Sequence, residues 1–148
     1  MAETVVIGLG NDYRGDDGAG LVTARLLRGL GVPAADNGGD PAELIEAWAG
    51  ADVAVVIDAA RSGEPPGVVR RFHGVFPPSR AGASSHALSL ADAVELARVL
   101  GRMPGELVVY TVEGATFALG EGLSQPVAAA TAALARTIAR DLAHEPGP

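Results

Sequence analysis

The fold is constrained most strongly by three short apolar runs that are separated by segments long enough to form helices. The runs cover residues 4–9 (TVVIGL), 53–57 (VAVVI) and 107–112 (LVVYTV), and β-branched side chains dominate each of them. Strands that read as continuous apolar runs are typical of parallel sheets covered by helices on both faces. We therefore expect an α/β fold built around one mostly parallel sheet.

The segments between the runs carry helix periodicity and helix end signals. Apolar side chains recur at helical spacing in residues 17–30 and 89–100, and a glycine follows each segment. Asp40 has Pro directly after it and Glu three residues on, which predicts that it is the N-cap of another helix. A long alanine-rich helix is predicted over residues 124–143, and residues 68–72 are expected to form an outer strand.

Composition excludes several classes of function. The chain has 148 residues, the usual size of one domain, and a formal net charge of −7, which argues against nucleic acid or an anionic membrane surface as a partner. All eleven basic residues are Arg, and Lys and Cys are both absent, so Schiff-base and thiol chemistry are excluded. No basic leader precedes an apolar segment, so we expect a cytoplasmic protein.

The loop after the first run has the glycine spacing of a phosphate-binding loop but carries the opposite charge. In GNDYRGDD, residues 10–17, Asp16 and Asp17 stand where a P-loop has Lys and then Ser or Thr. This loop therefore suits a cation rather than a phosphate. Asp16 is interpreted as the N-cap of the first helix. A dinucleotide-binding fingerprint also fails, because Tyr13 occupies the place of its third glycine.

The acidic residues also resemble those of a response-regulator receiver domain, which is an alternative interpretation. Such a domain also has an acidic pair after its first strand and an aspartate at a later strand end. It uses in addition a lysine at its last strand, and this chain has no lysine.

Polar residues are expected to converge where the parallel strands end, which is where ligands bind in open sheets. Asp17 follows the first strand, Asp58 comes directly after residues 53–57, and His86 lies in the loop that leads into the third helix. Carboxylate and imidazole together suit a divalent metal such as nickel, zinc, manganese or iron. Asp16 and Glu113 bring the number of acids expected at this edge to four. A helix-dipole role for Asp17 and a hydrogen-bonded loop position for His86 are the structural alternatives.

Four stretches in order resemble the hydrogenase maturation proteases, which remove the C-terminal extension from the large subunit of nickel-iron hydrogenases. They are GLGNDYRGDDGAG (8–20), VVIDAARSGEPPG (55–67), SSHALSLADAVELARVLG (84–101) and VVYTVEG (108–114). The resemblance extends over nearly the whole chain and implies a single domain over residues 1–148. It also implies a three-layer α/β/α sandwich with a twisted, mixed sheet of about five strands, and the strand not yet accounted for is expected near residues 32–36.

The resemblance further assigns roles to individual residues. It implies that Asp17, Asp58 and His86 bind the metal and carry the catalysis, with nickel presented by the substrate precursor, although another divalent metal would suit the same ligands. Asn11, Gly10 and Gly15 are expected to contact the substrate. The implied partner is a hydrogenase large-subunit precursor, and the protein is expected to act as a monomer.

Two alternative functions use the same residues. One is a nickel-binding assembly factor that docks the hydrogenase precursor without cutting it. The other is a related metallopeptidase that acts on a different precursor.

Overall fold

The computed structural model describes residues 3–11, 14–74, 85–117, 120 and 122–143, and for residues 85–89 it describes the backbone alone. The elements follow one another as β1 (Thr4–Leu9), the 3-10 turn η1 (Gly15–Gly18), α1 (Ala19–Gly29), β2 (Ala35–Asn37), α2 (Pro41–Trp48), β3 (Val53–Ala60), β4 (Val69–His73), α3 (Ser85–Leu100), β5 (Glu106–Glu113) and α4 (Gln125–Ala143). No helix within these ranges is long and apolar enough to cross a membrane.

The five strands form one mixed sheet in the order β2-β1-β3-β5-β4. All neighbouring strands are parallel except β4, which pairs antiparallel with β5 at the edge. The expected α/β fold with a mixed five-stranded sheet is thereby confirmed. The outer strand predicted over residues 68–72 is β4, and the strand sought near residues 32–36 is β2.

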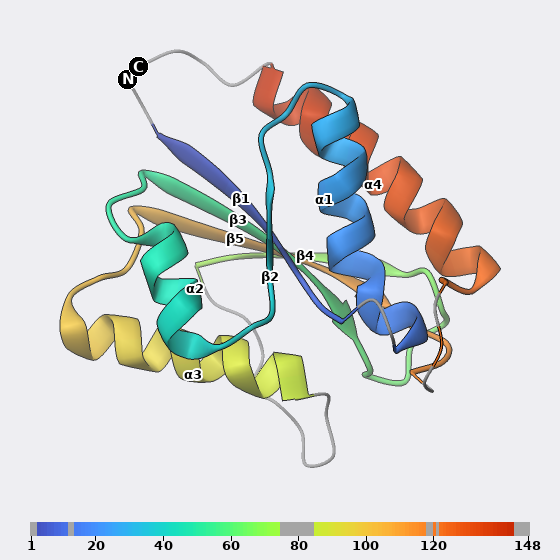
Figure 1. Cartoon of the computed structure of the whole chain (residues 1–148), viewed down its shortest axis with the longest axis horizontal. Coiled ribbons are helices and arrows are strands. Elements are labelled where there is room, and N and C mark those ends of the chain that lie inside the picture. The colour runs from blue at the N-terminus through green and yellow to red at the C-terminus, as the bar shows by residue number, and fades with distance from the viewer. Residues whose placement is uncertain (1–2, 12–13, 75–84, 118–119, 121, 144–148) are drawn as a thin grey trace.

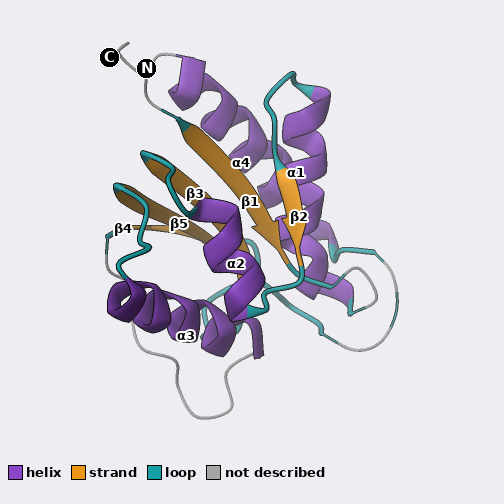
Figure 2. Ribbon diagram, turned by 60° about the vertical axis from the view of Figure 1, so that its left-hand side comes forward, coloured by secondary structure: helices purple, strands orange, loops and turns teal. Residues whose placement is uncertain are grey.

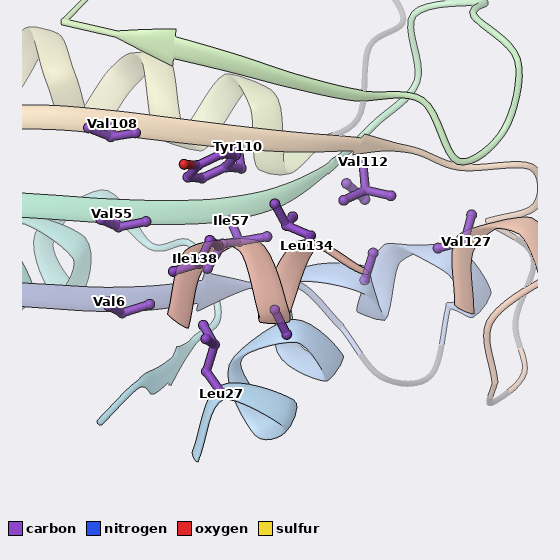
Figure 3. Packing of buried hydrophobic residues seen from close by; sticks show 13 residues of the cluster. Val6, Leu27, Val55, Ile57, Val108, Tyr110, Val112, Val127, Leu134 and Ile138 are labelled. Atoms are coloured by element: carbon purple, nitrogen blue, oxygen red, sulfur yellow. The ribbon is translucent and has the colours of Figure 1, made fainter. Parts of the chain in front are cut away.

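Helices cover both faces of the sheet. Helices α1 and α4 lie side by side on one face, and α2 and α3 lie on the other (Figures 1 and 2). Each face buries its own apolar core. The core under α1 and α4, shown in Figure 3, includes Val55, Ile57, Val112, Leu134 and Ile138. The core under α2 and α3 includes Leu44, Trp48, Ala54, Val56 and Val94.

Several predicted element boundaries need correction. The first helix begins at Ala19 rather than at residue 17, because residues 15–18 form the tight turn η1. The third helix begins at Ser85, four residues before its predicted start. The predicted N-cap of α2 is confirmed, since the Asp40 carboxylate accepts a hydrogen bond of 3.2 Å from the Glu43 amide.

The start of α1 lies close against strands β1 and β3, and glycine permits this approach. A Cβ atom added at Gly20 would lie 2.3 Å from the carbonyl oxygens of both Ile57 and Leu9. Backbone atoms cannot yield as a flexible side chain can. Gly20→Ala should therefore push α1 away from the sheet and destabilise the protein by about 1–3 kcal/mol or more, as overpacking usually does.

Urea unfolding of Gly20→Ala and Gly29→Ala checks this expectation. Gly29 ends the same helix, and a Cβ atom there would have no neighbour within 4 Å. Gly29→Ala should leave stability unchanged or raise it by up to about 1 kcal/mol, because alanine restricts the unfolded chain. Equal stability of the two variants would show that the close approach is not rigid.

Candidate functional site

The chain reverses its direction of travel across the sheet between β1 and β3. It passes from β1 through α1 outward to β2, and then returns through α2 to β3 on the other side of β1. In open α/β sheets, ligands bind beyond the carboxyl ends of the strands at such a switch point. The turn η1 follows β1 at this place and packs against β3. The first turns of α1 and α4 gather at the same end (Figure 1).

Two of the buried carboxylates at this edge are predicted metal ligands. Asp17 belongs to η1 and is only 4% exposed, while Asp58 lies in β3 and is 2% exposed. Asp58 was expected to follow the end of its strand, but β3 continues to Ala60, so this boundary was wrong. The Asp58 Oδ1 atom accepts a hydrogen bond of 2.8 Å from the Ala59 amide.

The alternation of side chains along β3 places Asp58 on the face that carries α2 and α3. Ala54 and Val56 pack in the core of that face, whereas Val55 and Ile57 pack in the opposite core. The register with β5 continues unbroken from Val53 to Ala60. Asp58 therefore follows Val56 onto the α2 and α3 face, because successive side chains of a strand point to opposite faces.

His86 lies in the first turn of α3 and not in a loop, which corrects the prediction. Helix α3 has 16 residues, so it is about 24 Å long. Its end connects through residues 101–105 to the start of β5, so its first turn lies toward the carboxyl edge, on the same face as Asp58. The His86 side chain and Ser84 lie outside what the structure describes. Among the side chains that it describes, no three metal-ligating groups converge, and the triad stays a prediction.

Asp16 is a buried clamp rather than the N-cap of the first helix. Its side chain makes no capping bond to α1. The Oδ2 atom accepts hydrogen bonds from the amides of Ala115 and Thr116, at 2.7 and 3.1 Å, and from the Ser124 hydroxyl at 2.8 Å. The Oδ1 atom accepts the Ser124 amide at 2.7 Å. Asp16 thus ties η1, which carries Asp17, to the loop after β5 and to the start of α4.

The hydrogen bonds of Asp16 also determine its ionisation. Burial of the carboxyl group raises its pKa, but the bonds from Ser124, Ala115 and Thr116 stabilise the charged form, and together they hold the pKa below its ordinary value. Asp16 is therefore a carboxylate at neutral pH. Its lone pairs are directed to the protein rather than to a ligand.

Glu113 also serves the structure of this edge. It ends β5 and is 4% exposed. Its carboxylate accepts the Ser62 amide at 3.0 Å, the Ser62 hydroxyl at 2.6 Å and the Gly63 amide at 3.3 Å. Glu113 therefore fixes the chain that leaves β3. Neither Ser62 nor Ser124 was identified from the sequence as a partner of these acids, because more than fifty positions separate the members of each pair.

The glycines of the first loop have conformational roles. A Cβ atom at Gly10 would lie 2.1 Å from the Asp17 carbonyl oxygen, and Gly15 has a φ of 56°, in the left-handed region. The Gly15 amide donates a 2.8 Å hydrogen bond to the Gly120 carbonyl. These contacts shape the loop around Asp17. Substrate contacts of Gly10, Asn11 and Gly15 stay predictions.

Carboxylates at this edge give it a negative charge, which suits a cation rather than an anion. Asp16 and Glu113 accept hydrogen bonds that fix the surrounding loops. Asp17 and Asp58 are the carboxylates predicted from the sequence to bind a metal ion, and both are buried at this edge. Carboxylates together with imidazole suit divalent metals of intermediate hardness. A protein-bound divalent ion can polarise a carbonyl group or generate a nucleophilic water.

Comparisons with known proteins agree on one family. The family model described as "Hydrogenase maturation protease" matches residues 26–141, which is more than half of the chain. The hydrogenase expression/formation protein HupD of Thiocapsa roseopersicina is 31% identical over 119 residues. That match covers 75% of this chain and 54% of HupD, so the chain spans about half the length of this curated relative.

Solved structures match over almost the full chain. The [NiFe] hydrogenase maturation protease HybD from Thermococcus kodakarensis is 31% identical, with a TM-score of 0.79 and coverage of 97% of this chain and 99% of that one. The hydrogenase maturating endopeptidase HybD from E. coli shares the fold, with a TM-score of 0.84 at 24% identity and coverage of 97% and 93%. The chain belongs to the hydrogenase maturation protease family.

Proposed function

We propose that this protein is an endopeptidase that removes the C-terminal extension from a nickel-iron hydrogenase large-subunit precursor after nickel insertion. Nickel bound in the precursor is the recognition element, and Asp17, Asp58 and His86 are the residues that contact it. The observation that carries this proposal is the pair of buried carboxylates at the switch point between β1 and β3. An acidic pair at this edge suits a cationic centre brought in by the substrate.

Family membership supports the peptidase part of the proposal. The T. kodakarensis protein, matched over 97% of this chain, is named as a [NiFe] hydrogenase maturation protease. The chain has no Cys or Lys, and none of its serines stands in a nucleophile elbow, so attack by water is favoured over a covalent intermediate. Hydrolysis then adds water across the scissile amide, the C–N bond breaks, and the released amine takes up the proton.

The chain's own residues have defined tasks in this reaction. Asp17 and Asp58 provide negative charge where the metal of the substrate would dock, and their burial excludes water from around that contact. Asp16 and Glu113 hold the loops that carry and flank them. When nickel is present in the precursor, it can supply Lewis-acid polarisation or an activated water.

Nickel-loaded and nickel-free precursor should behave differently with the purified protein. Mass spectrometry of the large subunit should show loss of a C-terminal peptide from the loaded form and no loss from the free form. If neither form is shortened while the protein binds the loaded precursor, the protein is an assembly factor without proteolytic activity. Equal cleavage of both forms would contradict recognition through nickel and favour a metallopeptidase of another kind.

A further inference from the structure

Arg61 presents a cation at the acidic edge of the sheet. It is the first residue after β3 and lies exposed, with its guanidinium over the Phe117 ring at 4.4 Å from the centroid. Within the described part of the chain, the Arg61 guanidinium has no carboxylate within ion-pair distance, whereas Arg28 and Arg102 pair with acids. A guanidinium stacked on a ring keeps the N–H groups along its edge free, and these match a carboxylate in a bidentate fork.

The protein holds this arginine in place from two sides. The Glu113 carboxylate fixes the backbone directly after it, through the amides of Ser62 and Gly63. The Phe117 ring is seated against Gly114, where a Cβ atom would lie 2.6 Å from the ring. Because Gly114 has no side chain, the Phe117 ring can occupy the position below the guanidinium. A preorganised arginine loses less conformational entropy when it binds a ligand.

Arg61 and Asp58 approach the edge from opposite faces of the sheet. Phe117 packs against the core of α1 and α4, whereas Asp58 lies on the face of α2 and α3. The Cα atoms of Arg61 and Asp58 are three residues apart in extended chain, so at most about 10–11 Å separates them. A substrate strand that crosses the edge at Asp58 would place its next few residues within reach of Arg61.

Charge indicates which chemical group belongs there. The protein has a net charge of −7, and Asp16, Asp17, Asp58 and Glu113 are all buried at this edge. An anionic substrate group is repelled by such an edge unless a cation receives it. Arg61, held over the Phe117 ring, is a cation at this edge that can receive such a group.

We propose that Arg61 binds a carboxylate of the departing C-terminal extension, within about three residues of the scissile bond. This inference rests on the proposed function. The retained body of the precursor carries the nickel and faces Asp58 and the start of α3. The extension then leaves toward the opposite face, where Arg61 and Phe117 lie.

Cleavage kinetics of Arg61 variants test the inference with nickel-loaded precursor, both natural and with every carboxylate of its extension converted to an amide. Arg61→Gln should lower kcat/KM for the natural precursor roughly 10- to 100-fold, mainly through KM, as expected for a lost charge-assisted hydrogen-bond pair. Arg61→Lys should recover part of the loss, because it keeps the charge without the planar fork. Arg98→Gln is the control. It removes an exposed arginine from the last turn of α3, whereas the first turn of that helix lies toward the candidate site.

The losses in kcat/KM caused by Arg61→Gln and by the amide form of the extension should not be additive in free energy. Wild-type protein should lose the same factor on the amide precursor, and Arg61→Gln should lose nothing further on that substrate. Phe117→Leu, which keeps apolar volume but removes the ring face, should raise KM for the natural precursor alone. Multiplicative losses, or an Arg61→Gln variant that behaves like Arg98→Gln, would overturn the inference.

A binding measurement separates this inference from the proposed function. Fluorescence anisotropy with a labelled synthetic peptide of the extension, in acid and amide forms, requires no cleavage. Wild-type protein should bind the acid form at least about tenfold more tightly, and Arg61→Gln should bind both forms equally. If no precursor is cleaved, this preference alone decides the role of Arg61, and its absence would overturn that role.

Discussion

Asp58→Asn should abolish cleavage of the nickel-loaded precursor while the protein stays folded. The substitution keeps the size of the side chain and its acceptor for the Ala59 amide, but it removes the negative charge at the switch point. Loss of an outer-shell partner of a metal typically costs about 10- to 100-fold in affinity or activity, so loss of a direct contact should cost at least about 100-fold. Asp17→Asn and His86→Ala should have the same effect.

Asp52→Asn is the matched control for Asp58→Asn. Asp52 directly precedes β3, so the same chemical change is made at the opposite end of the same strand, at an exposed position. Its cleavage rate should equal that of the wild type. Urea unfolding should show that each of these variants stays folded and loses no more than about 3 kcal/mol, the usual range for single substitutions.

Two results would change which residues are assigned to the site. If Asp58→Asn cleaves as well as Asp52→Asn, Asp58 does not belong to the catalytic edge. If it unfolds the protein, the carboxylate is structural and the site must be rebuilt around Asp17 and His86.

The strands were predictable because their signal is local. Buried parallel strands require apolar side chains on both faces, and the runs at residues 4–9, 53–57 and 107–112 all became strands. Their ends were less predictable. Side-chain polarity changes at Asp58, but the pairing of β3 with β5 depends on the backbone and continues through Asp58 to Ala60. Asp58, the polar residue of β3, is thus part of the strand and also part of the candidate site.

Long-range partners account for what the sequence could not indicate. Asp16 has the local pattern of a helix cap, yet its four hydrogen bonds come from residues about a hundred positions away. The pairing of Glu113 with Ser62 spans 51 positions and has no local signal either. Sequence reasoning correctly placed these acids at one edge of the sheet. It could not tell a buried clamp from a ligand, because that distinction depends on which loops return to the acid.

The clamp makes Asp16→Ala the substitution with the largest expected effect on stability. It leaves three backbone amides, of Ala115, Thr116 and Ser124, without the acceptor that they have in the folded protein. Unsatisfied donors of this kind cost about 1–3 kcal/mol each when buried, and partial hydration should reduce the sum to about 3–5 kcal/mol. Asp40→Ala is the matched control, because this exposed cap accepts one amide and should cost about 1 kcal/mol.

The pH dependence of stability tests the same clamp by its charge. The hydrogen bonds hold the pKa of Asp16 below its ordinary value in the folded protein, so the unfolded chain takes up this proton at a higher pH than the folded one. The stabilising contribution is therefore complete above about pH 4, the ordinary pKa of an aspartate, and is lost as the pH falls through the folded pKa. Urea unfolding of wild type and Asp16→Asn between about pH 7 and pH 3 should show a stability difference that narrows below about pH 4. A difference that stays constant over this range would mean that the charge of Asp16 contributes nothing and that its shape alone joins η1 to α4.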